Sequence, residues 1–194
     1  MNHRERFVAQ MHYQPVDRSP LYDFNFWNET IPEWHAQGLP ERVTKANAHH
    51  YFGLDASLGG GDQGWNIGLN NNLLPRFQNE TLEDRGETII VRQADGVIVE
   101  TGKHGHMSIP MHVGHTLNTR DDWEKLYKPK LDPTNPDRIP ADFEQRAARW
   151  TDPNVDHPLI VGAGSLYGWI RDWMGVEGVT MALYDDPAWF EDMV

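Results

Sequence analysis

Polar side chains in an aromatic segment near the start of the chain are the first candidates for chemistry. Residues 21–27 alternate aromatic and polar side chains, which predicts a strand with Asp23 and Asn25 on one face. A carboxylate held beside aromatic rings is partly desolvated, which suits it to proton transfer near neutral pH. We therefore take Asp23 as a candidate catalytic residue and Asn25 as a candidate substrate ligand. The alternative is a polar pair without chemistry.

A glycine-rich turn between a strand and a helix is the second candidate. Residues 158–162 form a short apolar run that predicts a buried strand, and the glycines at 162–164 predict a tight turn. Ser165 can cap the helix that follows. Gly164 and Ser165 are candidate substrate-binding residues, because such a turn can cradle an anion at a helix N-terminus. The dinucleotide-binding fingerprint fails here, and a plain tight turn is the alternative.

Two further groups of side chains carry weaker signals. Arg171 and Asp172 lie one turn into the helix after the glycine turn, where they either contact substrate or form a solvated helix face. Histidine imidazoles at close spacing can bind zinc, and four histidines cluster in this chain, at His104, His106, His112 and His115. The alternative is a polar hairpin edge, because no acidic residue or cysteine nearby completes the ligand set.

The composition limits the class of protein. The 194 residues have 17 Lys+Arg against 29 Asp+Glu, a net charge of -12, which disfavours nucleic-acid binding. The chain contains no cysteine, no apolar stretch of membrane-spanning length and no secretory signal. We therefore expect a cytoplasmic protein with no membrane partner. Eight tryptophans suggest a pocket for a flat organic ligand, with Trp27 as a candidate lining residue, or else a filled core.

The elements expected to position these residues alternate between strands and helices. Short helices are expected near residues 4–12, 31–37, 41–52, 119–124, 141–150 and 178–184. Three antiparallel strands, at roughly 76–84, 86–93 and 96–102, predict a β-meander with an Asp95-Gly96 turn. The last expected helix, from Pro187, stops within an apolar face. We therefore expect a single domain over residues 1–194 that continues beyond Val194, and a chain that is poorly folded or oligomeric without that continuation.

Several short motifs, in their order along the chain, resemble the uroporphyrinogen decarboxylase family. Residues 4–7 and 15–20 are similar to the family's entry helix and the proline-flanked Asp-Arg step that follows it. Residues 51–55 resemble its step toward the second strand. The best match is residues 158–164, PLIVGAG, which resemble the family's third-strand motif. The resemblance implies an α/β fold, a partial (β/α)₈ TIM barrel whose N-terminal strands are present, with the antiparallel meander inserted at about 76–118.

The resemblance also implies where the site lies. In a barrel, side chains at the carboxyl ends of the strands face one mouth, so Asp23, Asn25, Asp62 and Tyr167 are expected to converge. The family's second-strand aspartate has no clean counterpart here, and Asp55 and Asp62 are the nearest candidates. The family's third-unit tyrosine aligns with Asp172, with Tyr167 and Trp169 as aromatic neighbours. The arginines with which the family binds substrate carboxylates have no counterpart in residues 23–28, which disfavours uroporphyrinogen itself as the substrate.

The function that the resemblance implies is decarboxylation of a tetrapyrrole-like or other small carboxylated substrate. No cofactor within this chain is needed, because a protonated pyrrole-like ring is itself an electron sink. A carboxylate such as Asp23 or Asp62 would stabilise the cationic ring. One alternative is zinc-dependent methyl transfer with a corrinoid protein as partner, whose zinc ligands would lie beyond Val194. A second is a non-catalytic barrel that binds a small molecule. A homodimer is a possible assembly.

Overall fold

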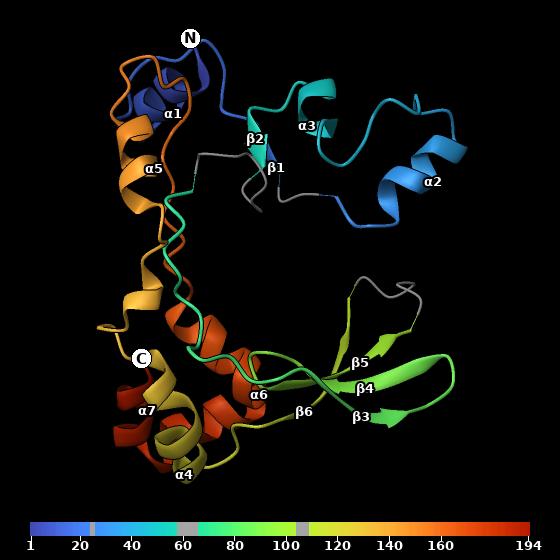
Figure 1. The fold of residues 1–194 in the computed structure, drawn as a ribbon, viewed down its shortest axis with the longest axis vertical. Helices are drawn as coiled ribbons and strands as arrows, with labels where there is room; N and C mark the ends of the chain where they lie inside the picture. The colour runs from blue at the N-terminus through green and yellow to red at the C-terminus, as the bar shows by residue number, and fades with distance from the viewer. Residues whose placement is uncertain (24–25, 58–65, 104–108) are drawn as a thin grey trace. The chain divides into compact units, whose positions relative to one another are not determined.

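The chain folds into two compact units, which are described one at a time. The computed structural model describes residues 1–23, 26–57, 66–103 and 109–194. Unit 1 comprises Met1–Leu69 and Ile139–Gly162, and unit 2 comprises Asn70–Arg138 and Ala163–Val194. Each unit therefore consists of two segments, and the segments of the two units alternate along the chain (Figure 1).

Unit 1 combines short helices with one pair of parallel strands. The strands are β1 (Tyr22–Asp23) and β2 (Ala56–Ser57), which pair in parallel. The helices are α1 (His3–Met11), α2 (Thr30–Ala36), α3 (Ala48–Tyr51) and α5 (Phe143–Trp150). Its small apolar core consists of Ile31, Val43 and Ala48, with Phe26, Trp34 and Leu39 packed against them. The strand and the helix expected at 21–27 and 41–52 are thus shorter than the sequence predicts.

A buried carboxylate joins α1 to the strands of unit 1. The side chain of Asp55, directly before β2, is only 1% exposed. Nη1 of Arg6 on α1 donates to its Oδ1 over 2.7 Å, Nη1 of Arg18 donates to its Oδ2 over 2.5 Å, and the backbone N–H of Leu21 also donates to it. Burial alone would raise the pKa of Asp55, but these partners hold it below its usual value. The ionised carboxylate therefore links α1 and Arg18 to the strand pair through hydrogen bonds and ion pairs.

Unit 2 is built on a four-stranded antiparallel sheet in which neighbours in sequence are neighbours in space. The strands are β3 (Glu80–Asp84), β4 (Thr88–Arg92), β5 (Val97–Gly102) and β6 (Met111–His115), in the order β3-β4-β5-β6. The meander with its Asp95-Gly96 turn is therefore present, and β6 adds a fourth strand to the three that the sequence predicts (Figure 1). Val97 and Val99 are buried on one face of β5, as a half-buried strand requires.

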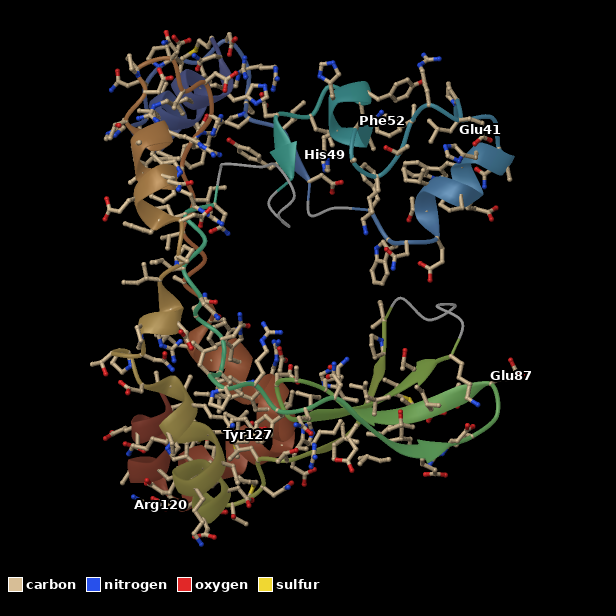
Figure 2. The ribbon with its side chains drawn as sticks, viewed as in Figure 1. Glu41, His49, Phe52, Glu87, Arg120 and Tyr127 are labelled. Atoms are coloured by element: carbon tan, nitrogen blue, oxygen red, sulfur yellow. The ribbon has the colours of Figure 1, made fainter. Side chains whose placement is uncertain are left out.

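The helices of unit 2 pack on this sheet and on one another. A capping box of Thr119 and Asp122 starts α4 (Arg120–Asp122), as expected, and the chain continues through η1 (Trp123–Tyr127) and η2 (Lys128–Leu131). A 3₁₀ turn, η3 (Pro136–Arg138), lies further along. α6 (Leu166–Asp185) contacts β5, β6 and α7 (Pro187–Met193). The buried core includes Leu117, Trp123, Tyr127, Ile170, Trp173 and Val179, of which Tyr127 is labelled in Figure 2.

The expected partial (β/α)₈ barrel is wrong. In the described part of the chain the main sheet is antiparallel and open, and parallel pairing is limited to β1 with β2 and to one bridge between Asn66 and Ile160. Residues 158–162 do not form the buried strand that their apolar character predicts, and Val161 is 50% exposed. A parallel strand needs neighbours along its whole length, and Ile160 has only this single bridge.

The helix expected at 178–184 is also longer than the sequence predicts. It is the second half of α6, which bends at Gly175, where φ is 80° and ψ is 161°. The backbone leaves the helical region at Gly175, and the helix resumes at once. None of the helices in the described part of the chain combines the length and the apolar character needed to cross a bilayer.

Candidate functional site

A cavity of about 400 Å³ in unit 2 brings together the most varied side chains. Its walls come from the segment 72–79 before β3, the turn 93–95 between β4 and β5, and one side of α6. The α6 side chains are Trp169, Asp172 and Trp173. Two of the ten lining side chains are aromatic and six are polar or charged, and a concave surface with both kinds of group can bind a small molecule. We take it as the candidate functional site and call it the unit 2 cavity.

Stacked aromatic rings form one wall of the unit 2 cavity and continue into the core. The ring centroids of Trp169 and Trp173 are 5.9 Å apart, those of Trp173 and Tyr127 are 5.2 Å apart, and those of Tyr127 and Phe77 are 5.2 Å apart. All three pairs are tilted, with interplanar angles of 35°, 43° and 52°. Such contacts add to the energy of burial and lock the rings in place. The cavity therefore has a rigid aromatic wall.

The β4–β5 turn supplies a second wall, and Tyr127 holds this turn. The hydroxyl of Tyr127 donates to the backbone carbonyl of Asp95 over 3.2 Å, and Oδ1 of Asp95 accepts from the backbone N–H of Val97. Gly96 has φ of +87°, and a Cβ there would lie 2.1 Å from the hydroxyl oxygen of Tyr127. Only glycine fits this position. Burial, with the nearby charge of Asp95, raises the pKa of Tyr127 well above its usual value, so the hydroxyl remains a donor at neutral pH.

Charged groups line the cavity as well. Arg76 is the basic residue among the ten that line it, and Asp95 and Asp172 are the acidic ones. Nε and Nη2 of Arg171 donate to Oδ1 of Asp172 over 3.0 and 2.8 Å, so this carboxylate is held by its neighbour on α6. Asn72, Asn79 and Gln93 add amide groups. The cavity can therefore pair with an anionic group through Arg76 and with a cationic or N–H group through the carboxylates.

One arginine fixes the backbone of the segment that begins the cavity. Arg138 donates from Nη1 to the carbonyls of Asn70 and Asn72, each over 3.0 Å. It also donates from Nη2 to the carbonyl of Lys130 and from Nε to that of Asp132, over 3.0 and 2.7 Å. Charge-assisted donation to several carbonyls from one planar guanidinium is geometrically specific. Arg138 therefore positions Asn72 without lining the cavity itself.

His115 on β6 supports α6 at its bend. A Cβ at Gly175 would lie 2.8 Å from Nε2 of His115, so the imidazole fills the space next to this glycine. Nδ1 of His115 is buried and has no hydrogen-bond partner among the described residues. Burial lowers the pKa of His115, and this outweighs the opposite effect of the backbone groups of Asp172 and Trp173. The neutral imidazole is thus the form that packs under the part of α6 that carries Asp172.

The structure places some of the sequence-predicted residues in or near this cavity. Asp172 and its aromatic neighbour Trp169 line the cavity. For Asp172 the sequence had left two alternatives open, a contact with substrate and a solvated helix face. Ser165 caps α6, its Oγ accepting from the backbone N–H of Gly168 over 3.0 Å, and Gly164 turns with φ of +73°. The hydroxyl of Ser165 therefore serves the helix, as the tight-turn alternative predicts. Tyr167 is 47% exposed in the first turn of α6.

Other predicted residues lie in unit 1 or outside the described residues. Asp23 is on β1, in register with Ser57, and Trp27 is 49% exposed. Asn25 and Asp62 lie outside the described residues. Since Asp23 belongs to unit 1 and Tyr167 to unit 2, the convergence of these side chains stays a prediction.

The predicted histidine cluster is only partly described. His104 and His106 lie outside the described residues. The ring centroids of His112 and His115 are 6.5 Å apart, and in the described part of the chain no group of three or more His, Cys, Asp or Glu side chains is arranged to hold a metal ion. His115 packs against α6, and metal binding by the four histidines stays a prediction.

Sequence analysis missed the cavity residues that precede β3 and those in the β4–β5 turn. Arg76 and Asn79 fall within the strand expected at 76–84, but β3 begins only at Glu80, so the expected strand did not indicate that they line a cavity. The Asp95-Gly96 turn was expected as a turn only. Two sequence features together could have indicated this wall of the cavity. One is the glycine in the Asp95-Gly96 turn, and the other is the aromatic residues within 123–127 and 169–173, which need other side chains or backbone to pack against.

Comparison with known proteins adds no relative. No protein-family model, no curated protein and no solved structure matches this chain. The functional argument therefore depends on the site itself.

Proposed function

We propose that the unit 2 cavity binds a small organic molecule that carries both a flat conjugated ring and an anionic group. The observation that carries this proposal is that the indole rings of Trp169 and Trp173, packed against each other, lie on the wall of a cavity that Arg76 also lines. Aromatic rings bind flat ligands through their faces, and arginine pairs with carboxylates through two parallel hydrogen bonds. A volume of about 400 Å³ suits a ligand of one or two rings.

The reaction that we propose for such a ligand is decarboxylation, the chemistry implied by the sequence resemblance. A pyrrole-like ring takes up a proton on carbon, the bond to the carboxylate breaks, and its electron pair moves into the ring. Carbon dioxide leaves, the carbon that lost it is protonated, and the ring gives up its proton. The net change replaces a carboxylate by hydrogen with uptake of one proton. Asp172 and Asp95 would stabilise the cationic ring, and Arg76 would hold a second anionic group that is not lost.

We also propose a cytoplasmic location and a small-molecule partner. The net charge of -12 opposes binding to a nucleic-acid backbone. No cofactor is required by the proposed reaction, because the protonated ring accepts the electron pair.

The binding step is tested with indole-3-acetate as the probe, by isothermal titration calorimetry. Arg76→Gln should weaken binding at least tenfold, because a hydrogen-bonded charge pair contributes roughly 1.5–3 kcal/mol. The matched control is Arg120→Gln on α4, an exposed arginine of unit 2 that does not line the cavity (Figure 2). Equal affinity for the two variants would contradict the assignment of Arg76.

The chemical step is tested with a pyrrole that carries both an acetate and a propionate group, labelled with ¹³C in the acetate carboxylate, by mass spectrometry of released carbon dioxide. Release that is lost in Asp172→Asn and kept in Asp185→Asn, a carboxylate at the far end of α6, would support decarboxylation. Binding of the pyrrole without release of labelled carbon dioxide would favour the non-catalytic binder instead.

A further inference from the structure

Unit 1 has a cavity of its own, of about 420 Å³, which we call the unit 1 cavity. One side of α5 lines it together with Asn66 and the segment 155–157. Three of the lining side chains come from α5. Arg149 and Trp150 follow Arg146 by three and four residues, which places all three side chains on one side of the helix. The helix therefore presents two guanidinium groups and an indole ring to the same space.

Arg146 is held in place from two directions. Its Nε donates to Oδ1 of Asp142, one turn earlier on the chain, over 2.8 Å. A Cβ at Gly68 would lie 2.5 Å from its Nη1, and Gly68 has φ of +82°. The guanidinium thus lies directly against the backbone of Gly68, where a larger residue would displace it. This contact orders the guanidinium before any ligand arrives, which lowers the entropic cost of binding.

The unit 1 cavity is locally positive in a chain whose net charge is -12. Asp142 is hydrogen-bonded to Arg146 and also interacts electrostatically with Arg149, so the two arginines and one carboxylate of the lining leave an excess of one positive charge. The imidazole of His157 also lines the cavity, where its Nδ1 lies 2.9 Å from Oδ1 of Asp156. An excess of positive charge on the wall of a concave surface attracts small anions.

The indole ring adds a flat apolar surface beside these charges. Trp150 is partly buried and meets the ring of Phe143 edge to face, with centroids 5.5 Å apart and an interplanar angle of 76°. This contact fixes the orientation of the indole. A ring fixed next to an arginine is suited to a ligand that has an aromatic part and an anionic part.

We propose that the unit 1 cavity is a binding site for a small aromatic anion, a phosphate ester or a carboxylate. Its anionic group pairs with Arg149 and Arg146, and its ring lies against Trp150. None of these residues belongs to the unit 2 cavity, so this proposal does not depend on the function proposed above.

The test uses phenyl phosphate as the probe, titrated into the whole chain by isothermal titration calorimetry. Phenyl phosphate should bind more tightly than cyclohexyl phosphate, which lacks the aromatic face, and more tightly than inorganic phosphate, which lacks the ring. Its affinity should fall as salt is added, because the contact is between charges. Equal affinity for phenyl and cyclohexyl phosphate would overturn the role of Trp150.

Single arginine variants then locate the ligand. Arg149→Gln should weaken binding of phenyl phosphate about tenfold or more. Because the side chain of Arg149 is exposed, we expect this variant to fold normally. Arg42→Gln, which removes another exposed arginine of unit 1 that does not line the cavity, should leave the affinity unchanged. Circular dichroism spectra of the variants check that the fold is kept.

The two cavities are told apart by crossing the variants. Loss of phenyl phosphate binding in Arg76→Gln but not in Arg149→Gln would place the ligand in unit 2 and overturn this proposal. Indole-3-acetate binding that Arg76→Gln leaves unchanged would count against the unit 2 cavity only. Absence of any binding of phenyl phosphate to the unaltered chain would overturn the unit 1 proposal alone.

Discussion

Replacing Gly96 by alanine should destabilise unit 2 far more than the same change at another glycine of the same sheet. Gly96 and Gly86 both have positive φ, +87° and +84°, so both variants suffer left-handed backbone strain of roughly 1–2 kcal/mol. At Gly86 nothing lies within 4 Å of the new Cβ. At Gly96 the Cβ would lie 2.1 Å from the Tyr127 hydroxyl and 3.1 Å from the ring of Phe77. The buried tyrosine must therefore move.

The additional cost at Gly96 has two parts. Forcing a methyl group into a filled core costs typically about 1–3 kcal/mol. Moving the Tyr127 hydroxyl also breaks its hydrogen bond to the carbonyl of Asp95, which contributes about 1 kcal/mol. Gly96→Ala should therefore lower the free energy of unfolding by about 2–4 kcal/mol more than Gly86→Ala.

Urea unfolding, followed by tryptophan fluorescence, measures this difference from the midpoints, provided that the slopes agree. In a Tyr127→Phe background the cost of Gly96→Ala should shrink by about 1–2 kcal/mol, because the nearest clashing atom is gone, and such coupling is what a double-mutant cycle detects. Equal costs at Gly96 and Gly86 would refute the position of Tyr127 under the β4–β5 turn, and with it the geometry of that cavity wall.

Three further predictions concern single polar side chains. Asp55→Asn should destabilise unit 1 by about 3 kcal/mol in urea unfolding, because Arg6 and Arg18 lose a buried carboxylate. Since the pKa of Asp55 is lowered in the fold, this stabilisation is complete above about pH 4 and should be lost as the pH falls further. The stability of Asp55→Asn should not show this decrease. The pKa of His115 is also lowered, which means that the fold favours the neutral imidazole. The stability of the fold should therefore decline as the pH falls below about 6.5, and this decline should be smaller in His115→Gln. Ser165→Ala should reduce stability by about 1 kcal/mol in thermal unfolding through loss of the α6 cap.

Local sequence signals predicted local structure well in this chain. The meander with its Asp95-Gly96 turn, the capping box of Thr119 and Asp122, and the cap at Ser165 all follow from side chains that act within a few residues of themselves. Such signals carry their own geometry, because a capping hydroxyl or a glycine with positive φ has few alternatives.

Long-range arrangement could not be predicted in the same way. The apolar run at 158–162 satisfies the pattern of a buried strand, yet a strand is defined by its neighbours, and Ile160 has only one bridge. The family resemblance supplied the missing neighbours by implication, and the barrel that it implied is wrong. The candidate site was equally hidden, because Arg76 and Asp172 are far apart in sequence and line one cavity only in the folded chain.

The two cavities differ in how their charges are arranged, and this difference should give the binding of their proposed ligands different dependences on salt. In unit 2, Arg76 lies among carboxylates, so a ligand must offer a group for both signs of charge, as a protonated ring with a carboxylate does. In unit 1, two arginines, Arg146 and Arg149, line the cavity with one carboxylate, Asp142, so the charged part of the affinity comes from the anionic group of the ligand. Salt should therefore weaken phenyl phosphate binding more steeply than indole-3-acetate binding, because a site with a net charge attracts its ligand over a longer range than one with mixed charges.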